Sequence, residues 1–379
     1  MKDLRVAFLL DMGPHNWKSQ EETHFRLCRA LVARGATPVL VYSGKVAEDV
    51  LSRMQSSGAE VITEARLHGT RHYYRNLKAT FRKFNVNLVH VRYFVCQSMI
   101  HWLARSLSVR RIIFTEANGY MPSNRGHWNL KRVLGRSQMK LACWPVTRFI
   151  AISQFIRDRL ILYGVNADRI AMVYNGIEVD RFAPDPEARI AWRRSQGIGP
   201  DEVVVSTVGR LDPIKRVDTI VHAFGELVKR GVPAQLFVAG AGPLESDLKA
   251  ISAGLGLADR IHWLGHVENA LPLFQASDIF TLASVGEAFG FVLAEAMACG
   301  VPCVGSRCGG IPEVVDEGRT GLLATPGDPC SFADAYERLA RDGGLCRAMG
   351  QAGVDRVRRL FDVDGAVENT LAVYEDVLK

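Results

Sequence analysis

Two glutamates, eight residues apart, lie in the segment of this sequence that is best equipped for chemistry. Glu287 falls in a glycine-containing stretch after a short apolar run, and Glu295 falls inside the helical pattern that follows. Carboxylates only accept hydrogen bonds, so they suit the hydroxyls of a sugar or the diol of a ribose. The amides of Gly290, Phe291 and Val292 would open that helix, where a phosphate is favoured. A helix cap and an exposed helix position are the alternative interpretation of the two glutamates.

A basic turn is the second segment that could bind a ligand. Gly209 follows the apolar run Val203–Val208, Arg210 and Lys215 come next, and a helical pattern starts at Val217. Glycine lets a ligand approach the backbone, and cations beside a helix N-terminus favour an anion. Arginine can contact a phosphate through two hydrogen bonds, whereas lysine acts as a point charge. These residues therefore predict a diphosphate clamp, with a basic surface turn as the alternative.

Two glycine-rich turns accompany these segments. Gly240-Ala-Gly-Pro243 follows one apolar run, and Gly309-Gly310-Ile-Pro-Glu313 follows another. Such turns are common punctuation between elements, so each carries little weight alone. We expect both to lie at the sheet edge that also holds the basic turn and the glutamate pair.

The elements that must position these residues alternate between short apolar runs and helical stretches. The runs expected to be strands are 5–10, 37–43, 60–63, 88–93, 111–115, 148–152, 170–174, 203–208, 235–239, 261–264, 279–283, 302–305 and 321–324. Strands alternating with helices predict parallel sheets covered on both faces. Because the alternation restarts after the proline-rich connection 181–200, we expect an α/β protein of two doubly wound, Rossmann-like domains that face each other across a deep cleft. Ligands bind such sheets outside the carboxyl ends of the strands.

Charge is divided unevenly along the 379 residues. The net charge is +7, but residues 1–184 contain 28 Lys and Arg against 13 Asp and Glu, and residues 185–379 contain 19 against 27. Residues 66–148 hold 16 basic residues and a single acid, Glu116. This asymmetry predicts an anionic partner, either an acceptor molecule or an anionic membrane surface. A solvated basic face without a partner is the alternative.

Composition excludes several classes of protein. With 48% hydrophobic and 23% charged residues, the chain is neither disordered, collagen-like nor coiled-coil. Its apolar runs are too short for a membrane-spanning helix, and residues 1–13 resemble a first strand more than a signal peptide. We therefore expect a cytoplasmic protein. Eight cysteines include no CxxC pair, so no metal site is expected.

Taken together and in this order, the motifs resemble the donor-binding domain of the retaining nucleotide-sugar glycosyltransferases of family 4, which have the GT-B architecture. The resemblance is most specific over residues 202–327 and extends more thinly over most of the chain. The residues that carry it are Gly209-Arg210-Leu211 with Lys215, Gly240-Ala-Gly-Pro243, Leu264-Gly265-His266-Val267, Glu287 with Glu295, Ala298-Cys-Gly-Val-Pro302 and Gly309-Gly310-Ile-Pro-Glu313.

The resemblance implies a domain plan and a role for each motif. Residues 1–180 would bind the acceptor, residues 181–360 would bind the nucleotide sugar, and a helix within 361–379 would cross back to the first domain. Glu287, Arg210 and Lys215 would take part in catalysis. The expected donor-binding residues are Gly209, Arg210, Lys215, Gly265, His266, Val267, Glu287, Phe289, Gly290, Phe291, Val292 and Glu295.

The first half departs from the family pattern. The usual Gly-Gly loop after the first strand is replaced by Ser19-Gln20, and only Gly13 remains nearby. A histidine frequent after the fifth strand is replaced within residues 115–119. The residues expected to serve the acceptor are Gly13, His90, Glu116 and Asn118.

The expected activity is transfer of a sugar, with retention, from a nucleotide-diphosphate sugar. A UDP-sugar is favoured and a GDP-sugar is the alternative; no cofactor or metal is expected, because the cations would stabilise the leaving diphosphate. The transition state should carry oxocarbenium character, as in glycoside cleavage. The expected acceptor is an anionic glycan or lipid-linked molecule of cell-surface polysaccharide or lipopolysaccharide synthesis.

The stretch 66–83 interleaves basic and aromatic residues, as a surface for a phosphorylated glycan or for the inner face of the cell membrane would. We expect no specific nucleic-acid partner. A nucleotide-sugar epimerase of the same architecture and a non-catalytic nucleotide-sugar-binding protein remain as alternatives. A dehydrogenase is disfavoured because no G-x-G-x-x-G follows residues 5–10.

Overall fold

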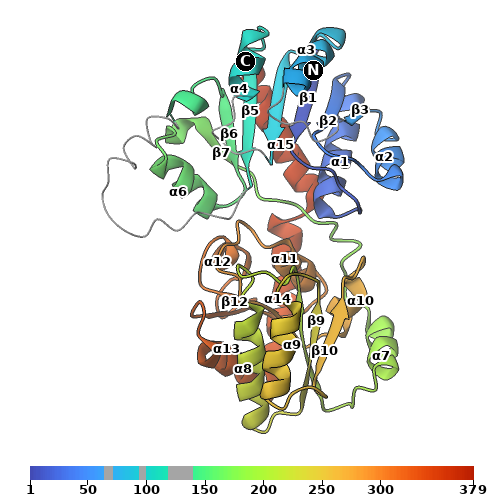
Figure 1. The fold of residues 1–379 in the computed structure, drawn as a ribbon, viewed down its shortest axis with the longest axis vertical. Helices are drawn as coiled ribbons and strands as arrows, with labels where there is room; N and C mark the ends of the chain where they lie inside the picture. The colour runs from blue at the N-terminus through green and yellow to red at the C-terminus, as the bar shows by residue number, and fades with distance from the viewer. Residues whose placement is uncertain (64–70, 94–99, 118–139) are drawn as a thin grey trace. The chain divides into compact units, whose positions relative to one another are not determined.

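The computed structural model describes residues 1–63, 71–93, 100–117 and 140–379 (Figure 1). The chain divides into two compact units. The N-terminal unit comprises Met1–Gly176 together with Val363–Lys379, and the C-terminal unit comprises Ile177–Asp362. Each unit contains one parallel sheet with helices between its strands, so the expected α/β class with two Rossmann-like domains is confirmed.

The sheet of the N-terminal unit has seven strands in the order β3-β2-β1-β4-β5-β6-β7. All of its strand pairs are parallel. The strands are β1 (Arg5–Leu10), β2 (Thr37–Tyr42), β3 (Glu60–Thr63), β4 (Leu88–Arg92), β5 (Arg111–Glu116), β6 (Arg148–Ala151) and β7 (Ile170–Met172). The helices are α1 (Ser19–Ala33), α2 (Glu48–Gln55), α3 (Arg71–Lys83), α4 (Ile100–Ser106), α6 (Gln154–Leu162), a 3-10 turn (Ala167–Arg169) and α15 (Val363–Leu378).

Helix α15 belongs to the N-terminal unit although it ends the chain. Its apolar positions, among them Val367, Leu371 and Tyr374, join the core beneath α1. On the surface, Arg26 and Arg34 of α1 form ion pairs of 2.9 Å with Asp364 and Glu368 of α15. Exposed pairs of this kind contribute about 0–1 kcal/mol each, so burial holds the helix in place.

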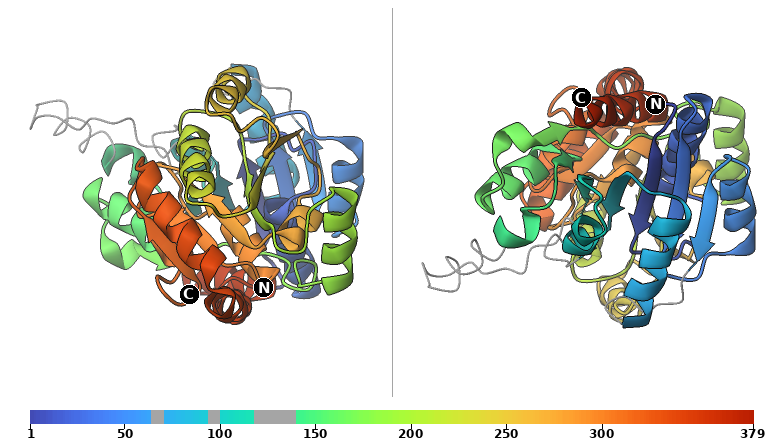
Figure 2. Two further views of the ribbon diagram at one scale, coloured as in Figure 1. Left: turned by 90° about the horizontal axis from the view of Figure 1, so that it is seen from below. Right: turned by 90° about the horizontal axis from the view of Figure 1, so that it is seen from above.

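The sheet of the C-terminal unit has six parallel strands in the order β10-β9-β8-β11-β12-β13. They are β8 (Val203–Val208), β9 (Ala234–Ala239), β10 (Ile261–Gly265), β11 (Ile279–Leu282), β12 (Cys303–Ser306) and β13 (Gly321–Ala324). The helices are α7 (Pro186–Ser195), α8 (Val217–Lys229), α9 (Glu245–Gly254), α10 (Leu271–Ala276), α11 (Phe291–Ala298), α12 (Ile311–Val314), α13 (Pro329–Arg341) and α14 (Gly343–Leu360). Helices cover both faces of the sheet (Figure 2).

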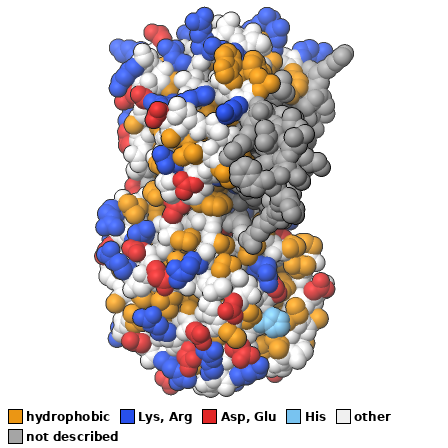
Figure 3. Space-filling model, turned by 90° about the vertical axis from the view of Figure 1, so that its left-hand side faces the viewer, with side chains coloured by type: hydrophobic (Ala, Val, Ile, Leu, Met, Phe, Trp, Pro, Cys, Tyr) orange, Lys and Arg blue, Asp and Glu red, His pale blue; other side chains and the backbone are white. Residues whose placement is uncertain are grey.

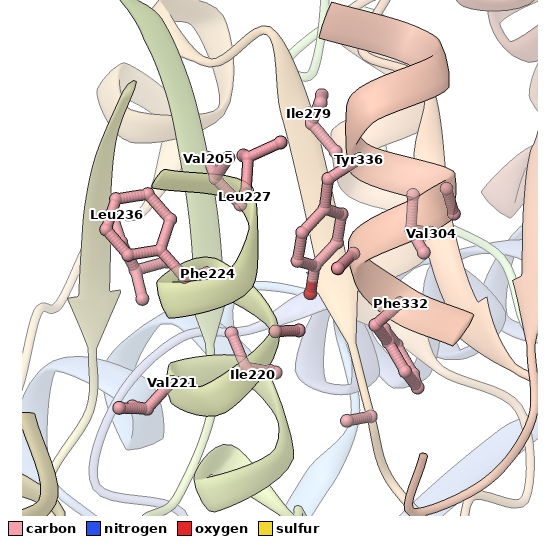
Figure 4. Packing of buried hydrophobic residues seen from close by; sticks show 14 of the residues in the cluster. Val205, Ile220, Val221, Phe224, Leu227, Leu236, Ile279, Val304, Phe332 and Tyr336 are labelled. Carbon is pink, nitrogen blue, oxygen red and sulfur yellow. The ribbon is translucent and has the colours of Figure 1, made fainter. Parts of the chain in front are cut away.

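The main core of the C-terminal unit lies between this sheet and helices α8 and α13 (Figure 4). Phe224 of α8 packs toward Leu236 of β9, while Phe332 and Tyr336 of α13 cover the middle of the sheet. The buried Tyr336 hydroxyl hydrogen-bonds to Thr281 at 2.8 Å, which satisfies the polar end of this large side chain. The core therefore fixes the strands whose carboxyl ends carry the candidate site.

No helix among the described residues combines the length and the apolar character needed to cross a membrane.

Candidate active site

The residues expected to bind the donor gather at the carboxyl edge of the C-terminal sheet. The loops after β8, β9, β10, β11 and β12 all leave from this edge. Strand order reverses between β8 and β11, and doubly wound sheets bind ligands at such a switch point. Both the basic turn and the glutamate pair follow these two strands.

The β9 turn supports the basic turn after β8. The Gly209 amide donates to the Ala239 carbonyl at 2.9 Å, and the Leu211 amide donates to the Ala241 carbonyl at 3.1 Å. Gly240 has φ +151°, and a Cβ there would overlap the carbonyl oxygen of Gly209. Glycine is therefore required at position 240 by the close approach of two backbones.

The loop after β11 is held by the loops on either side of it. The Val285 amide donates to the Ile214 carbonyl at 2.9 Å. On the other side, the Gly310 amide donates to the Glu287 carbonyl at 2.8 Å, and a Cβ on Gly309 would overlap that same carbonyl oxygen. The backbone of Glu287 is thus positioned by two neighbouring loops rather than by its own segment alone.

The structure brings Lys215 and Glu287 into direct contact. The Lys215 ammonium donates to the Glu287 carboxylate at 2.6 Å, and both side chains are about four-fifths buried. A hydrogen bond between charged groups is short and about twice as strong as a neutral one. The residue expected to bind the diphosphate, Lys215, and the residue expected to bind the sugar, Glu287, therefore lie in contact at the sheet edge.

Arg210 has a different environment. Its side chain is 77% exposed, and its Nε lies 3.4 Å from Asp212. An exposed, loosely paired guanidinium can turn toward an anionic ligand without leaving a buried partner behind. Its freedom to move is consistent with a ligand contact and gives it little part in stability.

Helix α11 begins next to Glu287. Gly290 is its N-cap with φ +98°, and no side chain caps the helix. Phe291, Val292 and Glu295 are each partly exposed on the helix. The uncapped N-terminus of α11 therefore offers amide donors near the Lys215–Glu287 pair.

The Phe289 side chain packs in the core and does not face a ligand site. Its side chain is almost fully buried, with ring centroids 5.2 Å from Phe361 and 5.4 Å from Phe291. Its aromatic ring anchors the loop to the core, so only its backbone remains for a donor contact.

The end of β10 lies at the same sheet edge, two strands from β8. Gly265 has φ +66°, and its carbonyl accepts from the Gly240 amide at 2.7 Å. His266 is exposed, whereas Val267 packs against a small apolar cluster that includes Phe237. These residues could line the outer part of a nucleotide site.

The residues expected to serve the acceptor are spread over the N-terminal unit. His90 is fully buried, and its ring nitrogens contact the Tyr374 hydroxyl at 2.6 Å and the Thr115 hydroxyl at 2.7 Å. Burial keeps the pKa of His90 well below its ordinary value. With both nitrogens engaged, His90 ties α15 to the sheet.

The other acceptor candidates differ in environment. Glu116 is buried and forms an ion pair with Arg159 at 3.1 Å, so it neutralises a buried cation. Gly13 lies against the loop after β2, where a Cβ would overlap the carbonyl oxygen of Lys45. Asn118 lies outside the described residues.

Sequence reasoning missed a buried polar group in the N-terminal unit. Its members are the buried residues Glu21, His24, Tyr42 and Arg92 and the partly buried Tyr93. All except Glu21 retain a buried polar atom with no hydrogen-bond partner among the described residues. The available signal was the charged residue Arg92 at the end of a buried strand whose other residues are apolar except for His90.

The described residues contain no cluster of His, Cys, Asp and Glu side chains that could hold a metal ion. Cys299 and Cys303 are buried, and burial raises the pKa of the Cys299 thiol to about 12. These two cysteines behave as small buried hydrophobic side chains.

Two family models match the chain in tandem. The one described as Glycosyltransferase Family 4 matches residues 20–181, and the one described as Glycosyl transferases group 1 matches residues 202–342. The second match contains the whole of the basic turn and the glutamate pair. The first match thus lies almost entirely on the N-terminal unit, and the second lies within the C-terminal unit.

Named relatives share much of the chain's length. The N-acetyl-alpha-D-glucosaminyl L-malate synthase of Bacillus anthracis is 33% identical over 301 residues, which covers 78% of this chain and 76% of that protein. The D-inositol 3-phosphate glycosyltransferase of Geodermatophilus obscurus is 30% identical over 359 residues, which covers 88% of this chain and 73% of that protein.

A solved structure shares the fold. Anabaena HepE in complex with UDP has a TM-score of 0.83 and 18% sequence identity, covering 98% of this chain and all of that one. The tandem family matches, the relative at 33% identity and the two Rossmann-like units lead to one conclusion: the chain belongs to glycosyltransferase family 4 and is a glycosyltransferase of the GT-B type.

Proposed function

We propose that this protein transfers a sugar, with retention of configuration, from a UDP-sugar to an acceptor that carries an anionic group. The observation that carries the proposal is the 2.6 Å contact between Lys215 and Glu287 at the switch point of the C-terminal sheet. It places a cation suited to a diphosphate beside a carboxylate suited to sugar hydroxyls.

The donor half of the proposal rests on this site and on the structural neighbour. HepE is described in complexes with UDP and with UDP-glucose, which supports a uridine nucleotide here over the alternative GDP-sugar. Lys215, Arg210 and the N-terminus of α11 would bind the diphosphate. Glu287 would bind the transferred sugar, and Glu295 would bind the ribose.

In the chemical step, the bond between the anomeric carbon and the diphosphate oxygen breaks, and an acceptor oxygen bonds to that carbon on the same face. The acceptor proton passes to a leaving phosphate oxygen. Lys215, Arg210 and the α11 amides stabilise the negative charge that the diphosphate gains, and a single such donor is commonly worth about 3–4 kcal/mol of barrier. These fixed cations make the reaction independent of a divalent metal in this proposal.

Two observations support an anionic acceptor: the basic charge of the first half of the chain and the substrates named for the relatives. Residues 66–148 are strongly basic, and the names of the relatives specify L-malate and D-inositol 3-phosphate, which are both anionic. We therefore favour a small anionic acceptor, with a hydroxyl that receives the sugar.

A lipid-linked acceptor at the inner face of the cell membrane is the second candidate. Leu141 and Trp144 are each at least three-fifths exposed, and Trp144 stacks on Trp102 at 5.5 Å. Figure 3 shows hydrophobic side chains gathered on one face of the N-terminal unit. Exposed tryptophan and leucine near arginines are typical of surfaces that dock on anionic membranes. Co-sedimentation with anionic liposomes at rising salt tests this candidate, and absence of binding at low salt would contradict it.

The deciding experiment is a donor screen. The protein is incubated with UDP-, GDP- and ADP-sugars, first alone and then with malate, inositol 3-phosphate and a neutral polyol. We expect UDP release to depend on acceptor and to be greatest with an anionic one. Conversion of the donor to an epimer without acceptor would support the epimerase alternative, and the absence of turnover with every donor would count against the proposal.

A further inference from the structure

Arg92 is buried at the switch point of the N-terminal sheet, and its Nε has no hydrogen-bond partner among the residues that the structure describes. Arg92 is the last residue of β4 and is only 7% exposed. Its Nε is buried without a hydrogen-bond partner, and across the part of the chain that the structure describes no carboxylate forms an ion pair with it. A buried charge that lacks a full ion-pair partner costs free energy, and a bound anion at this position would lower that cost.

Strand register places a second unsatisfied group in the same row. Leu10 of β1 pairs with Tyr42 of β2 on one side and with Arg92 of β4 on the other. Residues in register on parallel strands project to the same face of the sheet. Within the described ranges the Tyr42 hydroxyl is also buried without a hydrogen-bond partner, so it and Arg92 present hydrogen-bond donors along one edge.

Helix α1 and the residue after β4 contribute two more groups. The His24 ring lies 6.0 Å from the Tyr93 ring, and the Arg92 guanidinium lies 5.5 Å from it. The Tyr93 hydroxyl and the His24 Nε2 are both buried atoms with no hydrogen-bond partner in the part of the chain that the structure describes. Tyr93 has φ +65°, a left-handed conformation that is costly for a non-glycine residue and concentrates at functional sites.

Glu21 does not neutralise this group. Its carboxylate accepts a hydrogen bond from the Lys18 amide at 3.1 Å, and the Arg92 charge lowers its pKa without a direct ion pair among the described residues. Burial raises the pKa of Glu21 to about 7, so near neutral pH it carries only part of a negative charge. Burial also lowers the pKa of His24 well below its ordinary value, so its neutral Nε2 can accept a hydroxyl hydrogen.

We propose that Arg92, Tyr42 and Tyr93 bind the anionic group of the acceptor, a phosphate or a carboxylate, while His24 accepts a hydrogen bond from a neighbouring hydroxyl. The inference rests on the proposed function, whose acceptor is anionic, and it assigns that acceptor a site. Four unsatisfied polar groups meet at the point where an open α/β sheet binds its ligand. Such a set selects a molecule with both an anion and a hydroxyl.

The test is calorimetric titration of the full chain with inorganic phosphate and with succinate at constant ionic strength. We expect Arg92→Gln to weaken anion binding about tenfold or more, because a hydrogen bond to a charged group is lost. Arg92→Lys should recover part of the affinity. The matched control is Arg34→Gln, which removes one positive charge from a surface ion pair of the same unit. Tighter phosphate than succinate binding would assign a phosphorylated acceptor, and the reverse a carboxylate.

Tyr42→Phe keeps the inference testable should the arginine variants fail to fold. It removes only an unsatisfied hydroxyl, so we expect an unchanged or higher melting temperature together with weaker phosphate binding. Equal anion affinity in wild type, Arg92→Gln and Tyr42→Phe would overturn the inference. UDP affinity measured on the same proteins separates the two proposals: it should be unchanged in the variants, and its absence from the wild type would contradict the proposed function while leaving the anion result standing.

Discussion

The Lys215 ammonium and the Glu287 carboxylate meet at 2.6 Å although 72 residues separate them in the chain. The contact joins the loop after β8 to the loop after β11 across the switch point of the sheet. Without a donor, each charge serves as the partner of the other. A diphosphate sugar would offer a phosphate to Lys215 and hydroxyls to Glu287, so donor binding would exchange one set of charge-assisted bonds for another.

Replacement of Lys215 by alanine should lower turnover at least about tenfold, because it removes a fixed charge beside the leaving diphosphate. Initial rates with saturating donor, with and without magnesium, measure this, and added magnesium should make little difference. Lys229→Ala is the control, since Lys229 pairs with Glu226 at 2.7 Å on the surface of the same unit. Equal rates for the two variants would remove Lys215 from the catalytic site.

Arg210→Ala should separate activity from stability. The side chain is exposed and only loosely paired, so the melting temperature should stay within about 1 °C of the wild type. Turnover should nevertheless fall about tenfold or more if the guanidinium reaches the diphosphate in the donor complex. Unchanged turnover at saturating donor would contradict that contact.

Gly240→Ala should destabilise the C-terminal unit by about 3 kcal/mol, because the new Cβ would overlap the backbone carbonyl of Gly209 at a positive φ. The matched control is Gly254→Ala in α9, where a Cβ meets no atom within 4 Å. That change should be neutral or stabilising by up to about 1 kcal/mol. Denaturant unfolding of both variants checks the difference, and similar values would show that the close approach at Gly240 is easily relieved.

Glu21→Gln should change the pH dependence of stability. Burial raises the pKa of Glu21 from its ordinary 4.5 to about 7, so in this interval the folded protein holds a proton that the unfolded chain has released. The free energy of unfolding therefore falls as pH rises from about 4.5 to 7, by at most roughly 3 kcal/mol from this residue.

Glutamine can keep the hydrogen bond to the Lys18 amide and does not titrate, so the variant should lose this slope. Thermal unfolding midpoints of the two proteins across that pH range measure the effect. Parallel curves would show that Glu21 titrates normally.

Local patterns predicted the elements closely. The runs at 203–208 and 321–324 coincide with β8 and β13, and the helical pattern from Val217 coincides with the start of α8. Errors are confined to strand ends: the run at 170–174 continues past β7, which stops at Met172. Alternating apolar runs reflect burial on both faces of a parallel sheet, a property that each segment carries in its own residues.

The gathering of the expected donor residues at one sheet edge could also be predicted, because their motifs are contiguous. Each one follows a strand directly, and carboxyl ends of parallel strands meet at one edge, so their gathering needed only the strand order. Which of these side chains would be buried was harder to predict from the sequence. Phe289 resembled a loop residue open to ligand, yet it packs on Phe361, which lies 72 positions further along the chain.

The amino-acid sequence by itself determined the α/β class, the placement of most strands and the motifs at the donor edge, because hydrophobic periodicity and turn chemistry are local. Only the tertiary structure decided which distant polar groups pair and which stay unsatisfied. The His90 ring contacts the hydroxyls of Thr115 and of Tyr374 in the last helix, whereas the Nε of Arg92, two residues later, has no hydrogen-bond partner among the described residues. That difference depends on strand register and on helices packed from far along the chain, which no stretch of residues specifies alone.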